Sequence, residues 1–98
     1  MDEQVMRDRA KEHADAVARG DVDAVVADFT EALQPQFPEI AKVLPQPVTA
    51  AEVLSVEVGD TESVALIRYS GDAEAVVVRS RWQEQDGRPV IVHVEPAE

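Results

Sequence analysis

Short turn sequences divide the second half of the chain into runs that are rich in β-branched residues. The turns are Gly59-Asp60, Gly71-Asp72 and Asp86-Gly87, and the runs around them are Glu52–Val58, Ser63–Ser70, Glu74–Glu84 and Pro89–Glu95. Such runs are typical of strands, and Asp-Gly favours a two-residue hairpin turn because both of its positions tolerate positive φ. Connections this short join neighbouring antiparallel strands. The pattern therefore predicts a four-stranded antiparallel meander.

The first half of the chain has helical spacing instead. Neither Gly nor Pro occurs between Asp2 and Arg19, where apolar and small residues recur at helical intervals until Gly20. A second helix is predicted after Asp21, which can cap it, and its apolar face carries Val22, Val25, Val26, Phe29 and Leu33. Prolines bracket Glu39–Leu44 and leave room for one short helix. The predicted fold class is α+β, with two to three N-terminal helices packed on the four-stranded sheet in a single domain spanning residues 1–98.

Charge and composition exclude several classes of function. The 98 residues include 20 acidic and nine basic side chains, which gives a formal net charge of −11, and no cysteine. This charge opposes binding to nucleic acid or to anionic membranes, and the lack of thiols excludes disulfides and cysteine-ligated metals. Two histidines without a third ligand predict no metal site, and no phosphate-binding or dinucleotide fingerprint indicates a cofactor. With neither a signal peptide nor a membrane span in the sequence, a cytoplasmic protein is expected.

Turn geometry also predicts which residues pair across the sheet. A two-residue loop at Asp86-Gly87 gives the pairs Gln85 with Arg88, Trp82 with Ile91, Ser80 with His93, and Val78 with Glu95. A two-residue loop at Gly71-Asp72 gives the pairs Ile67 with Val76 and Tyr69 with Glu74. The first hairpin allows loops of different lengths, so the side of the sheet that Glu52–Val58 faces stays open.

This register predicts two faces of different character. The face toward the helices carries Ala65, Ile67, Tyr69, Val76, Val78, Ser80, Trp82, Ile91, His93 and Glu95. The helices can cover only that face, and the opposite one is rich in valine, so we predict a homodimer joined through the sheets. Arginines on the second face, Arg68 among them, are expected to form salt bridges rather than to bind nucleic acid. The predicted interface residues are Leu66, Val77, Arg79, Arg81, Val90, Val92 and Val94.

Two segments resemble a known superfamily. The run from Gly20-Asp21 to Asp28-Phe29 resembles the opening of the second helix in the nuclear transport factor 2-like superfamily, which includes SnoaL-like polyketide cyclases. The run from Arg81-Trp82 through Asp86-Gly87 to His93 is similar to the last hairpin of that superfamily. The resemblance implies a cystatin-like cone, in which a curved sheet wraps around helices and encloses a pocket, and it implies frequent dimers. The superfamily holds both enzymes and non-enzymes, so the fold does not decide activity.

The sequence departs from the superfamily pattern in three respects. Pro89 stands where an aromatic residue is usual, and Glu95 stands where a second histidine is common. The chain is also short, which implies a trimmed version of the fold without the early pair of strands.

Three residues are candidates for acid–base catalysis. His93 and Glu95 lie two apart on one strand, and the predicted register places both on the pocket face with Ser80 opposite the imidazole. His13 lies on the inward side of the first helix and could reach the same pocket. The alternative places His93 at a polar sheet edge, Glu95 at the C-terminus and His13 as a hydrogen-bonded core residue. The acids Asp15, Asp21, Asp23 and Asp28 are interpreted as helix caps and a solvated face.

The larger side chains of the predicted inner face suggest a ligand site. Tyr69 and Trp82, with Ser80 and Ile91, could line a cavity for an apolar guest, although the two aromatic residues also suit the core. Two functions follow. The first is a dimeric, non-catalytic binding module for an apolar small ligand or a protein partner. The alternative is an acid–base enzyme of the isomerase, dehydratase or polyketide-cyclase type, which needs two titratable groups in one cavity.

Overall fold

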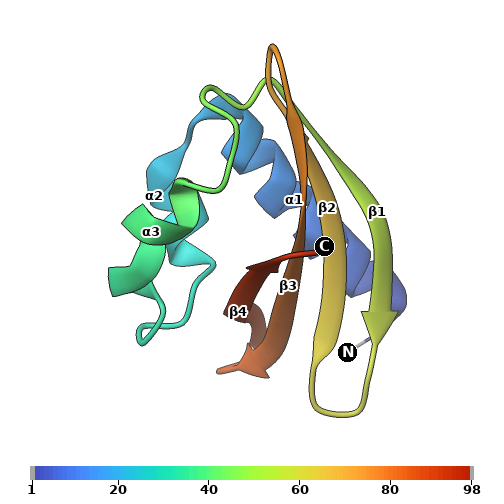
Figure 1. The fold of residues 1–98 in the computed structure, drawn as a ribbon. Helices are drawn as coiled ribbons and strands as arrows, with labels where there is room; N and C mark the ends of the chain where they lie inside the picture. Colours follow the sequence, from blue (N-terminus) through green and yellow to red (C-terminus); the bar gives the residue numbers. More distant parts are fainter. Residues whose placement is uncertain (1, 98) are drawn as a thin grey trace.

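The computed structural model describes residues 2–97, in which helices come first and strands follow (Figure 1). The helices are α1 (Glu3–Arg19), α2 (Val22–Ala27), a 3₁₀ turn at Gln34–Gln36 and α3 (Phe37–Ala41). The strands are β1 (Ala50–Val58), β2 (Ser63–Ser70), β3 (Ala75–Gln85) and β4 (Arg88–Pro96), paired antiparallel in the order β1-β2-β3-β4. The predicted α+β class and antiparallel meander are confirmed. None of the helices in this part of the chain is long and apolar enough to cross a membrane.

Capping residues set both ends of helix α1: Asp2 at its start and Gly20 at its end. The side chain of Asp2 accepts a hydrogen bond from the backbone N–H of Val5 at 2.9 Å, and Gly20 ends the helix with a positive φ of 75°. The buried face of α1 carries Met6 and small alanines, which allow the helix to lie close against β1 and β2. Opposite it, Trp82 and Ile91 of the sheet are completely buried, so the core lies between α1 and the inner face of the sheet.

Helix α2 is shorter than the apolar pattern predicts. The helix ends at Ala27, and the chain then runs beside β4: the N–H of Ile91 donates to the carbonyl of Asp28 at 2.7 Å, and the N–H of Thr30 donates to the carbonyl of Ile91 at 3.0 Å. The edge of β4 thus supplies backbone partners that replace a further helical turn. Phe29 is still buried, but Val22 is 53% exposed and does not belong to the buried face.

The β2–β3 loop is longer than predicted. Four residues, 71–74, form it, and the N–H of Gly71 donates to the carbonyl of Glu74 at 2.8 Å. The predicted pairs of Ile67 and Tyr69 are therefore wrong: the pairs are Ile67 with Val78 and Tyr69 with Val76. The slip is two residues, so the side chains of β2 and β3 keep their predicted faces.

The β3–β4 hairpin follows the prediction near its turn and departs from it further along. The pairs Gln85 with Arg88 and Trp82 with Ile91 are confirmed. A β-bulge then inserts Val92, so the predicted pairs of His93 with Ser80 and of Glu95 with Val78 are wrong. The pairs beyond the bulge are Arg81 with His93, Ser80 with Val94, Arg79 with Glu95 and Val78 with Pro96.

The first hairpin, whose register the sequence left open, also contains an irregularity. Val58 pairs with Ser63 across a loop of residues 59–62, and the register shifts between Val53 and Ser55. Val56 is buried on the inner face, so β1 contributes to the same core as β2 and β3.

Candidate functional site

The predicted catalytic pair lies on the outer face of the sheet, away from the core. The side chains of His93 and Glu95 are 44% and 46% exposed, and His93 Nε2 lies 3.8 Å from Glu95 Oε1, beyond hydrogen-bond distance. The prediction that both face the pocket is wrong because the bulge at Val92 turns them to the other side. They share no cavity with His13.

His13 lies inside the protein and forms part of an ionic cluster. Its Nδ1 is 2.8 Å from Asp28 Oδ2, and the other oxygen of Asp28 is 2.5 Å from Arg9 Nη2. His13 and Asp28 are buried, whereas Arg9 is partly exposed. The cluster ties α1 to the segment that follows α2. Interpreting Asp28 as part of a solvated face was wrong; the available signal was that Arg9 and His13, four residues apart, share one face of the helix.

The charge of this cluster follows from its contacts. Burial by itself raises the pKa of Asp28, but the hydrogen bond and charge of His13, followed by the charge and hydrogen bond of Arg9, outweigh burial and hold the pKa below its ordinary value of 3.8. Asp28 is therefore ionised at neutral pH. An ionised carboxylate only accepts hydrogen bonds, so His13 donates the hydrogen bond from Nδ1 to Asp28. Nε2 is the ring nitrogen that does not contact Asp28.

A small cavity of about 30 Å³ lies between the sheet and the helices. Among its lining residues are His13, Tyr69, Ser80 and Ile91, three of which the sequence predicted as ligand-lining. Tyr69 is 3% exposed and its hydroxyl forms no hydrogen bond to any of residues 2–97; burial and then the charge of Asp28 raise its pKa. The cavity holds a water-sized group but no organic substrate.

Two polar groups near this cavity already have partners. Trp82 Nε1 donates to Ser80 Oγ at 2.9 Å, and Ser80 Oγ donates to the carbonyl of Ala65 at 3.4 Å. Trp82, which was also predicted to line a ligand site, instead packs edge-on against the His13 ring, with centroids 5.6 Å apart. Trp82 is thus a core residue.

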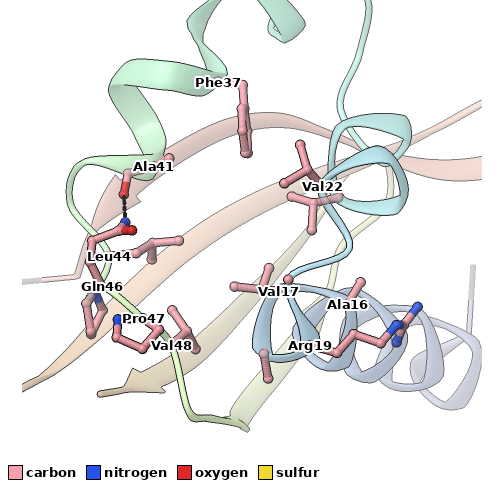
Figure 2. A pocket seen from close by; sticks show the side chains of 14 residues that line it. Ala16, Val17, Arg19, Val22, Phe37, Ala41, Leu44, Gln46, Pro47 and Val48 are labelled. Atoms are coloured by element: carbon pink, nitrogen blue, oxygen red, sulfur yellow. Dashed lines mark hydrogen bonds between the residues drawn. The ribbon is translucent and has the colours of Figure 1, made fainter. Parts of the chain in front are cut away.

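A larger groove lies between helix ends and the proline-rich connector that joins α3 to β1. Its volume is about 430 Å³ and it is open to solvent (Figure 2). Its walls are mainly apolar side chains from α1, α2, α3 and the connector: Val17, Val22, Val25, Phe37, Leu44 and Val48. Arg19, which pairs with Asp21 at 3.3 Å, lies among the lining residues. Sequence reasoning placed the pocket under the sheet and missed this groove; Leu44 and Val48, apolar residues beside prolines, line it and also pack against the core.

The outer face of the sheet mixes apolar and charged side chains. Leu66, Val77, Arg79 and Arg81 are partly exposed there, on the side that the sequence predicted. Val92, the bulge residue, is partly exposed and has no partner in β3. Val90 is only 5% exposed, and Val94 packs against the core because the bulge turns it inward, so its predicted outward position is wrong. Two ion pairs on this face, Arg68 with Glu52 and Arg81 with Glu62, have N–O distances of 3.9 Å.

Comparison with known proteins identifies a structural relative. No family model and no curated protein matches the chain. Among solved structures, the chain is similar to the solution structure of RPA3114, a SEC-C motif containing protein from Rhodopseudomonas palustris, with a TM-score of 0.65 and 18% sequence identity. The match covers 98% of this chain and 78% of that chain. At this identity the likeness shows that the two chains share a fold.

Proposed function

We propose that the chain is a small non-catalytic binding domain of the nuclear transport factor 2-like type, acting in the cytoplasm, whose groove takes an apolar small molecule. The groove itself carries the proposal: its volume of about 430 Å³ lies within the range of small-molecule sites, and its lining is mainly apolar. A concave site walled by several elements suits a small molecule better than the broad surface of a protein partner.

The acid–base alternative has weaker support. His93 and Glu95 are exposed on the outer face, and the cavity that His13 and Tyr69 share is only about 30 Å³. The cavity that these titratable groups share is therefore too small to enclose a whole substrate molecule.

The groove is tested by placing a charge in it. Val22 lines the groove, is 53% exposed and lies in the first turn of α2, so Val22→Glu is expected to fold. Because a carboxylate beside an apolar ligand must lose water, binding of the neutral dye N-phenyl-1-naphthylamine, followed by its fluorescence, should weaken about tenfold. Val5→Glu is the matched control, since Val5 is 46% exposed in the first turn of α1 and does not line the groove. Equal binding by the two variants would contradict the proposal.

As part of the same proposal, two copies associate through the outer face of the sheet. Support comes from the partly exposed apolar side chains of Leu66 and Val77 on that face. The ion pairs of Arg68 and Arg81 on the same face are loose, with N–O distances of 3.9 Å, which leaves both guanidinium groups able to contact a second subunit. Sedimentation equilibrium at micromolar concentration is expected to give twice the monomer mass, and Leu66→Glu should return it to the monomer mass. A monomer mass for the unmodified chain would refute the dimer and leave the groove unaffected.

A further inference from the structure

One layer of side chains separates the groove from the small cavity. Four apolar residues line both spaces: Val17, Val25, Phe37 and Leu44. Figure 2 shows that Val17, Phe37 and Leu44 project toward one another from α1, α3 and the connector.

The cavity on the far side of this layer has polar side chains in its wall. The hydroxyl of Tyr69, a residue that is 97% buried, has no hydrogen-bond partner among residues 2–97 and lines the cavity. His13 lines it too, and because its Nδ1 contacts Asp28, Nε2 is the ring nitrogen left for a second partner. A hydroxyl that lines a cavity and has no partner in this part of the chain is available to a polar group that enters the cavity.

We propose that the groove and the cavity are two compartments of one site, which takes an apolar molecule with a single terminal hydroxyl group. The apolar body occupies the groove, and the hydroxyl passes between Phe37 and Leu44, whose side chains rotate to admit it. There it forms hydrogen bonds with the Tyr69 hydroxyl and with His13 Nε2. This rests on the proposed binding function of the groove and adds the chemical class of its ligand.

Size and charge both select a neutral hydroxyl. About 30 Å³ accommodates a group the size of a water molecule, which excludes a ring or a branched head group. The ionised Asp28, which already disfavours a negative charge on Tyr69, would also repel a carboxylate. An alcohol satisfies both Tyr69 and His13 without bringing a charge into the core.

Two ligands with the same carbon skeleton test the proposal: propylbenzene and 3-phenyl-1-propanol. Tyr69→Phe removes only the hydroxyl, which has no partner to lose, so this variant is expected to fold. In titrations followed by NMR, Tyr69→Phe should weaken the alcohol about fivefold and change propylbenzene by less than about twofold. Val22→Glu is the control, because it should weaken both ligands to the same extent.

The outcomes separate the two proposals. If Tyr69→Phe changes both ligands equally or neither, the two-compartment site is overturned while the groove stands. If the unmodified chain binds neither the two ligands nor N-phenyl-1-naphthylamine, the groove proposal fails and the two-compartment site fails with it. A second measurement is the nuclear Overhauser effect from the hydroxyl-bearing methylene group of the alcohol. It should reach the methyl groups of Val78 and Val94 in the cavity, and contacts only to Val22 and Val48 in the groove would overturn the two-compartment site.

Discussion

Replacing Asp28 by alanine is expected to lower the free energy of unfolding by about 3–5 kcal/mol, because removing one partner of a buried ionic cluster leaves the others uncompensated. Asp28 is 8% exposed, and it bonds His13 at 2.8 Å and Arg9 at 2.5 Å. Its loss leaves the buried His13 and the guanidinium of Arg9 without the carboxylate that holds α1 to the segment after α2. Urea unfolding followed by the fluorescence of Trp82 measures the change.

Asp15→Ala is the matched control for this substitution. Asp15 is an exposed acid on α1 that makes no ion pair within residues 2–97, so its removal should change stability by less than about 0.5 kcal/mol. A loss below about 1 kcal/mol for Asp28→Ala would show that the cluster contributes no more than a surface ion pair.

The same cluster makes stability depend on pH in a defined direction. The pKa of Asp28 is lower in the folded protein than its ordinary value of 3.8, so the unfolded chain binds the proton more readily. The contribution of ionised Asp28 to the free energy of unfolding is therefore complete above pH 3.8, and it is lost as the pH falls through the lower pKa that Asp28 has in the folded protein. Urea unfolding should be measured from neutral pH to pH 3 for the unmodified chain and for Asp28→Ala. The difference between their free energies of unfolding should narrow only at the acidic end of this range.

How far the sequence predicted the sheet depended on distance from a turn. Asp86-Gly87 set the pairs next to it, Gln85 with Arg88 and Trp82 with Ile91. Further along, Val90 to Val94 is apolar at almost every position, so alternation could not reveal that Val92 is an extra residue. That one residue moved His93, Glu95 and Val94 to the opposite face from the predicted one.

The candidate site depended on contacts that local pattern does not encode. Asp28 resembles the other acids of the helical region in sequence, and only the fold brings it to His13 and Arg9, 15 and 19 residues earlier. The groove arises in the same way, because Leu44 and Val48 become part of its wall only when the connector lies against the ends of α1 and α2 (Figure 2). Periodicity identified the elements, but tertiary packing determined the site.

The second large effect is expected at Trp82, where alanine should lower the free energy of unfolding by about 3–5 kcal/mol through loss of buried area and the cavity left behind. Trp82 is completely buried, packs edge-on against His13 and donates to Ser80 Oγ at 2.9 Å. Since it is the only tryptophan, circular dichroism rather than fluorescence must follow unfolding.

Trp82→Phe separates the two roles that the sequence allowed for this residue. Phenylalanine keeps an aromatic ring in the core but loses the hydrogen bond to Ser80, so a smaller loss of about 1–2 kcal/mol is expected. Because Trp82 lines neither the groove nor the cavity, N-phenyl-1-naphthylamine should bind this variant as it binds the unmodified chain. Weaker dye binding by Trp82→Phe, under conditions in which the variant is fully folded, would instead make Trp82 a ligand contact. The binding site would then lie beneath the sheet.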